Sequence, residues 1–348
     1  MRIARHVRRL EGYVPGEQPK TRRVVKLNTN ENPYPPSPKC TEVLRSFDPD
    51  RLRRYPDPCF EELRGELAHL NGTSPERVFV GNGSDEILSL AARCFVEDCE
   101  TIGSLDPSYS LYKTLAAIRN VRWTGVAPGS AMPWLRSAKS RECALFLWTN
   151  PNAPTGGFAE PEEIAAFSRA FRGVLLVDEA YADFARANCM SLATAERNRN
   201  VIVMRTFSKS YSLAGLRVGY CVGPEDLVDA MYKVKDSYNV DAVAQAVALA
   251  AVRDQAWMAA NVRKIAKTRK NLSTELSARG WDVTPSEANF VFARPPRGDA
   301  ERVFGELRAR GIFVRYFKGP KTGDRVRITV GTDTQTVKLL KAIDEIDL

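Results

Sequence analysis

The feature that most constrains the fold of this chain is an alternation of short apolar runs with helical patterns, from about residue 78 to residue 235. Short runs rich in Val, Ile and Leu fit buried strands. Strands that alternate with helices predict a mainly parallel sheet covered on both faces. Helices are predicted at Asp85–Phe95, Pro161–Phe171 and Asp226–Lys235. The predicted strands are Val78–Val80, Thr101–Ser104, Ala144–Trp148, Val174–Val177, Val201–Met204 and Val218–Val222.

The chain is predicted to divide into three parts. Its 348 residues suffice for one large and one smaller domain. Residues 1–29 are predicted to form an N-terminal arm that packs with the small domain, residues 30–255 the large domain, and residues 256–348 a small α+β domain. A long helix, straight or bent, is expected through Val240–Thr274 near the boundary.

Composition excludes several classes of protein. The apolar runs are too short to span a bilayer, and no apolar stretch follows the basic N-terminus as a secretory signal requires. Seven scattered cysteines lack metal-ligand spacing, so we expect reduced thiols, a cytoplasmic protein and no metal. The net charge of +9 is dispersed, without the aromatic-interleaved stripe of a nucleic-acid binder. It could attract phosphorylated or carboxylated substrates, and ordinary surface charge explains it equally well.

A lysine stands in the most informative segment, shortly after the predicted strand Val201–Met204. Lys209 lies between two serines and ahead of small residues, which would let a flat molecule approach the backbone. A lysine that forms a Schiff base must be held rigidly and must lose its proton readily. Thr206, Ser208 and Arg217 could bind a phosphate, and the fork of an arginine suits that task. The segment therefore indicates pyridoxal phosphate, whereas a solvated lysine in an ordinary loop is the alternative.

Polar side chains also follow two other predicted strands, where a parallel sheet binds its ligands. Ser84 and Asp85 follow a glycine-containing turn and open a helix, whose free N–H groups would bind an anion. Asp178 follows the apolar strand Val174–Val177, and a carboxylate there would keep a pyridine nitrogen protonated. Tyr181 could hydrogen-bond the ring hydroxyl. Ordinary helix capping and strand-end turns are the alternatives.

An aromatic side chain and a turn complete the candidate cofactor site. Tyr109 could stack on the pyridine ring, and it is preferred to Tyr112 because it lies closer to the end of its strand. A tyrosine that packs at a helix start is the alternative. The turn Asn150–Gly156 needs no function as a turn, but its asparagines could also reach the cofactor.

Together these segments resemble the aspartate-aminotransferase type of fold-type-I pyridoxal-phosphate enzymes, and more narrowly the histidinol-phosphate aminotransferases. The resemblance covers almost the whole chain and is more specific for fold than for substrate. It implies an α/β fold, in which a large domain with a mainly parallel sheet is joined to a smaller α+β domain. The matching segments are Leu27–Tyr34, Arg54–Asp57, Gly81–Glu86, Asn150–Gly156, Asp178–Tyr181, Arg205–Gly219 and Arg327–Thr332.

The resemblance implies how the cofactor is held. Lys209 would form the Schiff base and then move a proton, Asp178 would pair with the pyridine nitrogen, and Tyr181 would bond the ring oxygen. Tyr109 would stack on the ring. The cofactor phosphate would be bound by Ser84, Asp85, Thr206, Ser208 and Arg217.

The resemblance also implies a substrate site and a second subunit. Arg315 and Arg327 would bind the anionic end of the substrate, with Tyr13 and Asn30 nearby. Tyr55 would reach the cofactor phosphate of the other subunit, which implies a homodimer with shared active sites.

One departure from the family pattern concerns the ring oxygen. The family usually has Asn directly before Pro-Thr-Gly, and this chain has Ala153 there. Either Asn152 replaces that asparagine through a shifted turn, or Tyr181 acts alone.

The resemblance implies transamination between L-histidinol phosphate and 2-oxoglutarate, as in histidine biosynthesis. An aromatic-amino-acid aminotransferase is a close alternative, and a lyase like threonine-phosphate decarboxylase would use the same lysine. A regulatory pyridoxal-phosphate protein without catalysis would normally carry a fused DNA-binding domain, for which this chain has no room.

Overall fold

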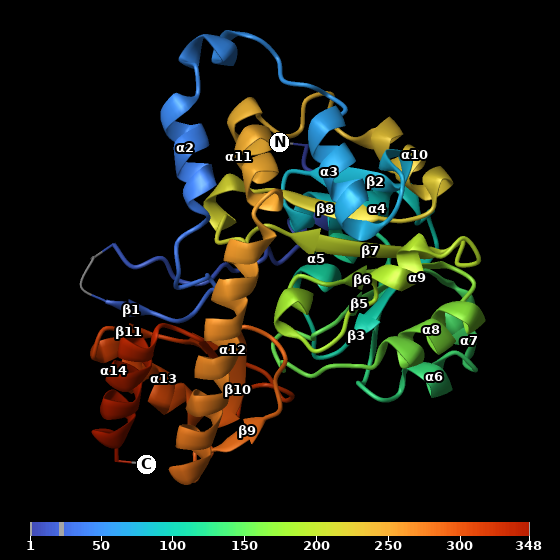
Figure 1. The fold of residues 1–348 in the computed structure, drawn as a ribbon. Coiled ribbons are helices and arrows are strands. Elements are labelled where there is room, and N and C mark those ends of the chain that lie inside the picture. The colour runs from blue at the N-terminus through green and yellow to red at the C-terminus, as the bar shows by residue number, and fades with distance from the viewer. Residues whose placement is uncertain (1, 21–23, 348) are drawn as a thin grey trace.

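The structure, a computed structural model, describes residues 2–20 and 24–347. Residues 1, 21–23 and 348, which belong to the predicted arm and the predicted small domain, lie outside this range. A seven-stranded sheet in the order β2-β8-β7-β6-β5-β3-β4 forms the centre of the larger part (Figure 1). Its strands are β2 (Val78–Gly81), β3 (Thr101–Leu105), β4 (Arg122–Val126), β5 (Cys143–Thr149), β6 (Val174–Asp178), β7 (Val201–Thr206) and β8 (Gly219–Val222).

The prediction of a mainly parallel sheet is confirmed. Strands β4, β3, β5, β6 and β7 pair in parallel, while β8 runs antiparallel to both β7 and β2. The six predicted strands match observed ones to within two residues at each end. The edge strand β4 was not predicted, because it is half-exposed and therefore lacks a continuous apolar run.

Helices cover both faces of this sheet, as alternating side chains along its strands require. Leu145 and Leu147 face the group that contains α4 (Ser84–Cys94), α5 (Leu111–Arg119) and α10 (Glu225–Val234). Phe146 and Trp148 face the other group. That group comprises α2 (Pro38–Ser46), α3 (Glu61–Asn71), α8 (Pro161–Ala170), α9 (Met190–Thr194) and α11 (Ala242–Val252). Short helices are α1 (Arg5–Arg8), α6 (Ala131–Trp134), α7 (Ala138–Arg141), η1 (Pro49–Arg53), η2 (Pro75–Arg77), η3 (Ala182–Phe184) and η4 (Ala214–Leu216).

The single long helix expected through Val240–Thr274 is instead two helices. Helix α11 ends at Val252, and α12 (Gln255–Ala278) begins after Asp254, whose side chain accepts a hydrogen bond from the backbone N–H of Trp257. An Asp at this position is a normal helix start, which explains the break. Figure 1 shows α12 running from α11 to the C-terminal part of the chain.

The C-terminal part has its own core. A four-stranded sheet, β12-β13-β10-β9, packs with α13 (Ala300–Ala309) and α14 (Asp333–Asp344). The arm strand β1 (Val25–Lys26) pairs in parallel with β11 (Ile312–Phe313), and Leu27 is buried in this core. The arm is thereby anchored to the C-terminal part. The other strands are β9 (Asp282–Thr284), β10 (Phe290–Arg294), β12 (Arg315–Tyr316) and β13 (Val326–Thr329). No helix within residues 2–20 and 24–347 is both long and apolar enough to cross a membrane.

Candidate active site

A cavity of about 260 Å³ lies at the carboxyl ends of β2, β3, β5, β6 and β7, the edge where parallel sheets bind ligands. The N-terminal arm and the C-terminal strands β12 and β13 close it from the other side. All but two of the predicted site residues line this cavity: Tyr13, Asn30, Ser84, Asp85, Tyr109, Asp178, Tyr181, Thr206, Ser208, Lys209, Arg217, Arg315 and Arg327.

Lys209 is held in the loop that follows β7. Its Nζ donates to the backbone carbonyl of Thr29 at 3.2 Å. The amide of Asn32 donates to the carbonyls of Lys209 and Ser210, each at 3.1 Å. Burial, together with the positive charge of Arg327, lowers the pKa of Lys209 to about 8. A rigid lysine with a lowered pKa suits nucleophilic and proton-transfer chemistry.

Asp178, the last residue of β6, is a buried carboxylate with neutral donors. Its Oδ2 accepts from the Tyr112 hydroxyl at 2.7 Å, and its Oδ1 from the backbone N–H of Ala180 at 3.1 Å. Burial raises the pKa of Asp178 to about 6, while these two hydrogen bonds oppose the shift. A cationic group placed in the cavity would stabilise the ionised form of such a carboxylate.

Tyr181 is connected to the arm and to β13 through Asn30. The Asn30 amide donates to the Tyr181 hydroxyl at 2.9 Å, and its Oδ1 accepts from Thr329 at 3.0 Å. Asn30 has a left-handed backbone, with φ of 56°, and its carbonyl accepts from Asn289. Both ends of the Asn30 amide are engaged, so Asn30 holds the Tyr181 hydroxyl in place. Its contact with the substrate stays a prediction.

The start of α4 forms a positively polarised corner of the cavity. No side chain caps the first N–H groups of this helix, which begins at Ser84. The Arg217 guanidinium lies within reach of the Ser208 hydroxyl (3.3 Å) and of Asp85 (3.4 Å). Gly219 is required here, because a Cβ would lie 2.7 Å from the Ser84 nitrogen. Free helix N–H groups beside an arginine suit a phosphate.

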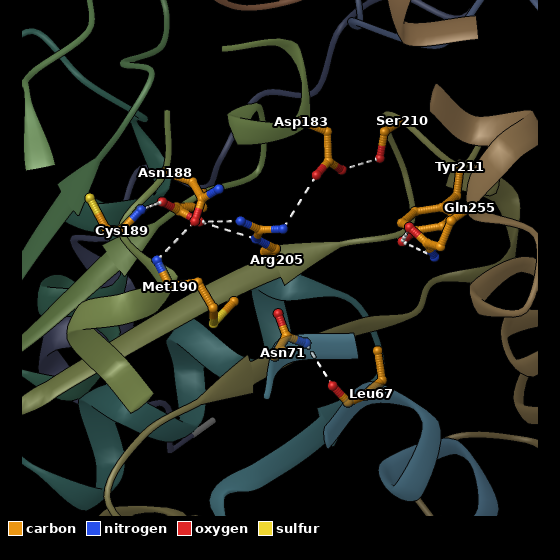
Figure 2. Close-up of polar contacts among 11 residues, drawn as sticks. Leu67, Asn71, Asp183, Asn188, Cys189, Met190, Arg205, Ser210, Tyr211 and Gln255 are labelled. Carbon is orange, nitrogen blue, oxygen red and sulfur yellow. Dashed lines mark hydrogen bonds and ion pairs between the residues drawn. The ribbon is translucent and has the colours of Figure 1, made fainter. Parts of the chain in front are cut away.

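A network of buried charges fixes the end of β6 to the loop after β7. Glu179, whose side chain is fully buried, pairs with Arg205 at 2.9 Å. Arg205 also lies 3.4 Å from Asp183, which accepts a hydrogen bond from the Ser210 hydroxyl (Figure 2). Ser210 directly follows Lys209, so this Glu179–Arg205–Asp183 network holds the loop that carries the lysine.

Two arginines face the cavity from the C-terminal part. Arg327 donates to the Asn28 carbonyl at 3.0 Å, and its buried Nε has no partner within the described residues. Burial, with the nearby Arg315 adding to the effect, lowers the pKa of Arg327. The two terminal nitrogens of the Arg315 guanidinium, Nη1 and Nη2, donate to the carbonyls of Pro15 and Val14 in the arm. Arg327 is therefore the cation with free capacity for an anionic ligand.

The two remaining predicted residues lie outside this cavity. The amide of Asn152 donates to the Pro107 carbonyl at 3.0 Å and to the Thr155 hydroxyl at 2.9 Å, while Ala153 lines the cavity. The predicted cofactor contact of Asn152 is therefore not supported by its position, because its donors are already used. Tyr55 is 79% exposed and stacks on Tyr238.

Sequence reasoning missed several residues of the site. Thr29, Glu31 and Phe317 line the cavity from the arm and the C-terminal part. Tyr112, set aside in favour of Tyr109, supplies the hydroxyl that bonds Asp178. The spacing of the two tyrosines was a usable signal, because residues three apart at a helix start can serve one site from different depths.

Comparison with known proteins shows the family of this chain. The family described as Aminotransferase class I and II matches residues 22–343. The chain belongs to the class I and II aminotransferases. This membership confirms the fold and enzyme class that the resemblance implied.

Relatives within this aminotransferase family are similar over nearly their full length. The chain is 43% identical over 348 residues to a histidinol-phosphate aminotransferase of Syntrophotalea carbinolica, covering 99% of each chain. It is 41% identical over 344 residues to histidinol-phosphate aminotransferase 1 of a Nostoc species, covering 98% of this chain and 97% of that one. The crystal structure of histidinol-phosphate aminotransferase from Sinorhizobium meliloti in complex with pyridoxal-5'-phosphate superposes with a TM-score of 0.85. That match has 27% identity and covers 92% of this chain and 90% of the other.

Proposed function

We propose that this aminotransferase binds pyridoxal phosphate and moves an amino group between L-histidinol phosphate and 2-oxoglutarate, as in histidine biosynthesis. The names of relatives at 41% and 43% identity support the substrate. The observation that carries the proposal is that Lys209, Asp178 and Arg327 line one cavity. The buried Nε of Arg327 has no hydrogen-bond partner within the described residues.

The residues of the cavity fit the cofactor. The uncapped start of α4 and Arg217 form a phosphate site, and Asp178 offers a carboxylate with neutral donors to a pyridine nitrogen. Tyr181 would bond the ring oxygen and Tyr109 would stack on the ring. Pyridoxal phosphate, when bound, supplies an electron sink for the bonds of the amino-bearing carbon.

Each catalytic step needs a defined act of the protein. Lys209 would hold the cofactor before substrate enters, and its Nζ would then carry the proton taken from the amino-bearing carbon. A pKa of about 8 leaves an appreciable fraction of neutral amine near neutral pH, which this role requires. Arg327 would orient the substrate through its phosphate or carboxylate, so that the carbon to be deprotonated faces Lys209.

A panel of amino donors tests the substrate. With 2-oxoglutarate as acceptor, histidinol phosphate should give the highest kcat/KM, above phenylalanine and phosphothreonine. A higher value for phenylalanine would favour an aromatic-amino-acid aminotransferase. Release of carbon dioxide from phosphothreonine without any need for an oxo acid would favour a lyase.

We also propose a homodimer with shared active sites. Tyr55 lies on the exposed segment between η1 and α3, stacked on Tyr238 with ring centroids 4.3 Å apart. A large aromatic residue that is 79% exposed and does not line the cavity of its own chain fits a role in the site of a second copy.

Subunit mixing tests this arrangement. A Lys209→Ala subunit and a Tyr55→Phe subunit together give one site with both defects and one with neither. Activity should reappear on exchange, provided that each parent is impaired. No recovery after verified exchange would count against shared sites. The cytoplasmic location stays a prediction.

A further inference from the structure

The side chain of Tyr112 is buried where the proposed mechanism assigns it no task. It lies in the first turn of α5 and is 1% exposed. Its hydroxyl is 2.7 Å from Oδ2 of Asp178 and 2.5 Å from Oγ1 of Thr149. A phenylalanine would fill the same space in the core, so the hydroxyl calls for its own explanation.

The hydrogen bonds around this hydroxyl have a preferred direction. Burial and the Asp178 charge raise the pKa of Tyr112 far above its ordinary value, so the phenol keeps its proton and donates it to the carboxylate. The phenol oxygen can then accept the proton of Thr149. Thr149 also lies 3.1 Å from Ser108, and both of these residues line the cavity.

The hydrogen bond from Tyr112 opposes the effect of burial and favours the charged form of Asp178. Within the described residues its hydrogen-bond donors are Tyr112 and the Ala180 N–H, both neutral. The charges of Asp85 and Glu179 are among the main influences on the pKa of Asp178, and both raise it, which favours the protonated form. A hydrogen bond from a neutral donor to a carboxylate is about twice as strong as one to a neutral oxygen.

We propose that Tyr112 is a positioning residue that keeps Asp178 ionised and correctly oriented for the cationic nitrogen of the cofactor, and that Thr149 in turn orients Tyr112. This inference rests on the proposed function. It assigns Tyr112 an electrostatic task, in contrast to Tyr109, which faces the cavity directly.

Tyr112→Phe tests the inference, with Tyr220→Phe as its matched control. Tyr220 is also 1% exposed and lies in β8 of the sheet that contains Asp178, but it is not among the hydrogen-bond partners of Asp178. Titration of the apoproteins with pyridoxal phosphate should show an affinity loss on the order of 10-fold for Tyr112→Phe. The control should bind like wild type, and thermal unfolding of both apoproteins reports any general packing defect.

Two further measurements separate positioning from packing. The infrared spectrum of Tyr112→Phe apoprotein at neutral pH should contain a protonated carboxyl band that wild type lacks and that Tyr112→Phe/Asp178→Asn loses. In the Asp178→Asn background, Tyr112→Phe should change cofactor affinity by no more than about 2-fold, since a neutral amide gains less from the phenol. Thr149→Val should show a smaller loss than Tyr112→Phe, and none when combined with it.

The outcomes are distinguishable. Wild-type affinity in Tyr112→Phe, or equal losses in Tyr112→Phe and Tyr220→Phe without the carboxyl band, would overturn the inference and leave the proposed function standing. A wild-type protein that binds pyridoxal phosphate but transfers no amino group would refute the proposed reaction, while the infrared and affinity results still decide the task of Tyr112. A wild-type protein that does not bind the cofactor would overturn both.

Discussion

Two sides of the cavity are built in opposite ways. The sheet wall, formed by Asp178, Tyr181, Thr206, Ser208 and Lys209, follows strands of the seven-stranded sheet and is tied by buried side-chain contacts. The arm wall, formed by Tyr13, Gly16, Arg315 and Phe317, comes from the N-terminal arm and the C-terminal part, and backbone carbonyls satisfy its arginine.

The difference between the two walls fits two separate requirements of an aminotransferase, namely to keep its cofactor bound and to let its substrate enter and leave. A cofactor that stays bound benefits from groups whose positions are fixed before it arrives. A substrate that must enter and leave benefits from a wall that can yield, and hydrogen bonds to an exposed arm are more easily exchanged than buried ion pairs. The following predictions test whether the sheet wall is the stiffer of the two.

The largest expected effect is on stability, at Arg205. Arg205→Met leaves Glu179 buried without its partner, which should lower the free energy of unfolding by roughly 3–5 kcal/mol. Arg315→Met in the arm wall removes exposed contacts, namely hydrogen bonds to two arm carbonyls and a cation–π contact with Phe317, and should stay within about 1 kcal/mol. Urea denaturation of the apoproteins measures both. Adding Glu179→Gln to Arg205→Met should restore part of the loss, and similar losses at the two arginines would erase the distinction between the walls.

The next effect is a pH dependence at Lys209. Its pKa falls from an ordinary value near 10.5 to about 8 in the folded protein, so the folded state resists charging this amine. The cost of this charge to the free energy of unfolding is fully present below pH 8. It decreases as pH rises from 8 to 10.5 and is absent above 10.5, where the amine is neutral in both states. Lys209→Met apoprotein should therefore exceed wild type in unfolding free energy by about 3 kcal/mol at pH 7, with the gap closing between these values. Denaturation at several pH values measures it, and a constant gap would show that charge is not the cause.

Sequence alone predicted the sheet wall better than the arm wall. Ser84, Asp178 and Lys209 each follow an apolar run, and strand periodicity together with the binding edge of parallel sheets is enough to bring them together. Tyr13 was predicted only through resemblance, because its approach to the cavity depends on how the arm packs.

The missed features depend on tertiary geometry or on a weak local signal. The orientation of Asn152 depends on a turn whose neighbours, Pro107 and Thr155, capture its amide. The hydrogen bond between Tyr112 and Asp178 joins α5 to β6. The three-residue spacing of Tyr109 and Tyr112 shows that both side chains could reach one site, but the identity of the partner, Asp178, depends on the tertiary packing. The break before α12 did have a local signal, since Asp254 is a good helix cap.

A smaller effect concerns substrate binding at the two cationic side chains. Arg327→Ala should cost roughly 2–3 kcal/mol in kcat/KM for both histidinol phosphate and 2-oxoglutarate, because its buried guanidinium has free capacity for an anion. Arg315→Ala should cost about 1 kcal/mol in kcat/KM, because its donors are already hydrogen-bonded to carbonyls of the arm. The loss should be larger with histidinol phosphate than with 2-oxoglutarate. Steady-state kinetics with each substrate varied in turn measures the difference. Equal and small effects would place the anion site elsewhere and remove the support that Arg327 gives to the proposed function.

The smallest expected effect is at Asn30, the residue that joins the sheet wall to β13. Its backbone φ of 56° lies in the left-handed region, where a Cβ costs about 1 kcal/mol and Asn or Gly is tolerated. Asn30→Gly removes the hydrogen bonds to Tyr181 and Thr329 but tolerates the left-handed backbone. Asn30→Ala removes the same hydrogen bonds and also puts a residue with a Cβ into that unfavourable backbone conformation. The Ala variant should therefore be less stable than the Gly variant by about 1 kcal/mol in urea denaturation, the reverse of the usual order for the two residues. If the Ala variant proves equally or more stable, the fold does not hold this backbone in place. The hydrogen bond between Asn30 and Tyr181 would then be as easily rearranged as the contacts of the arm wall, and would not share the rigidity expected of the sheet wall.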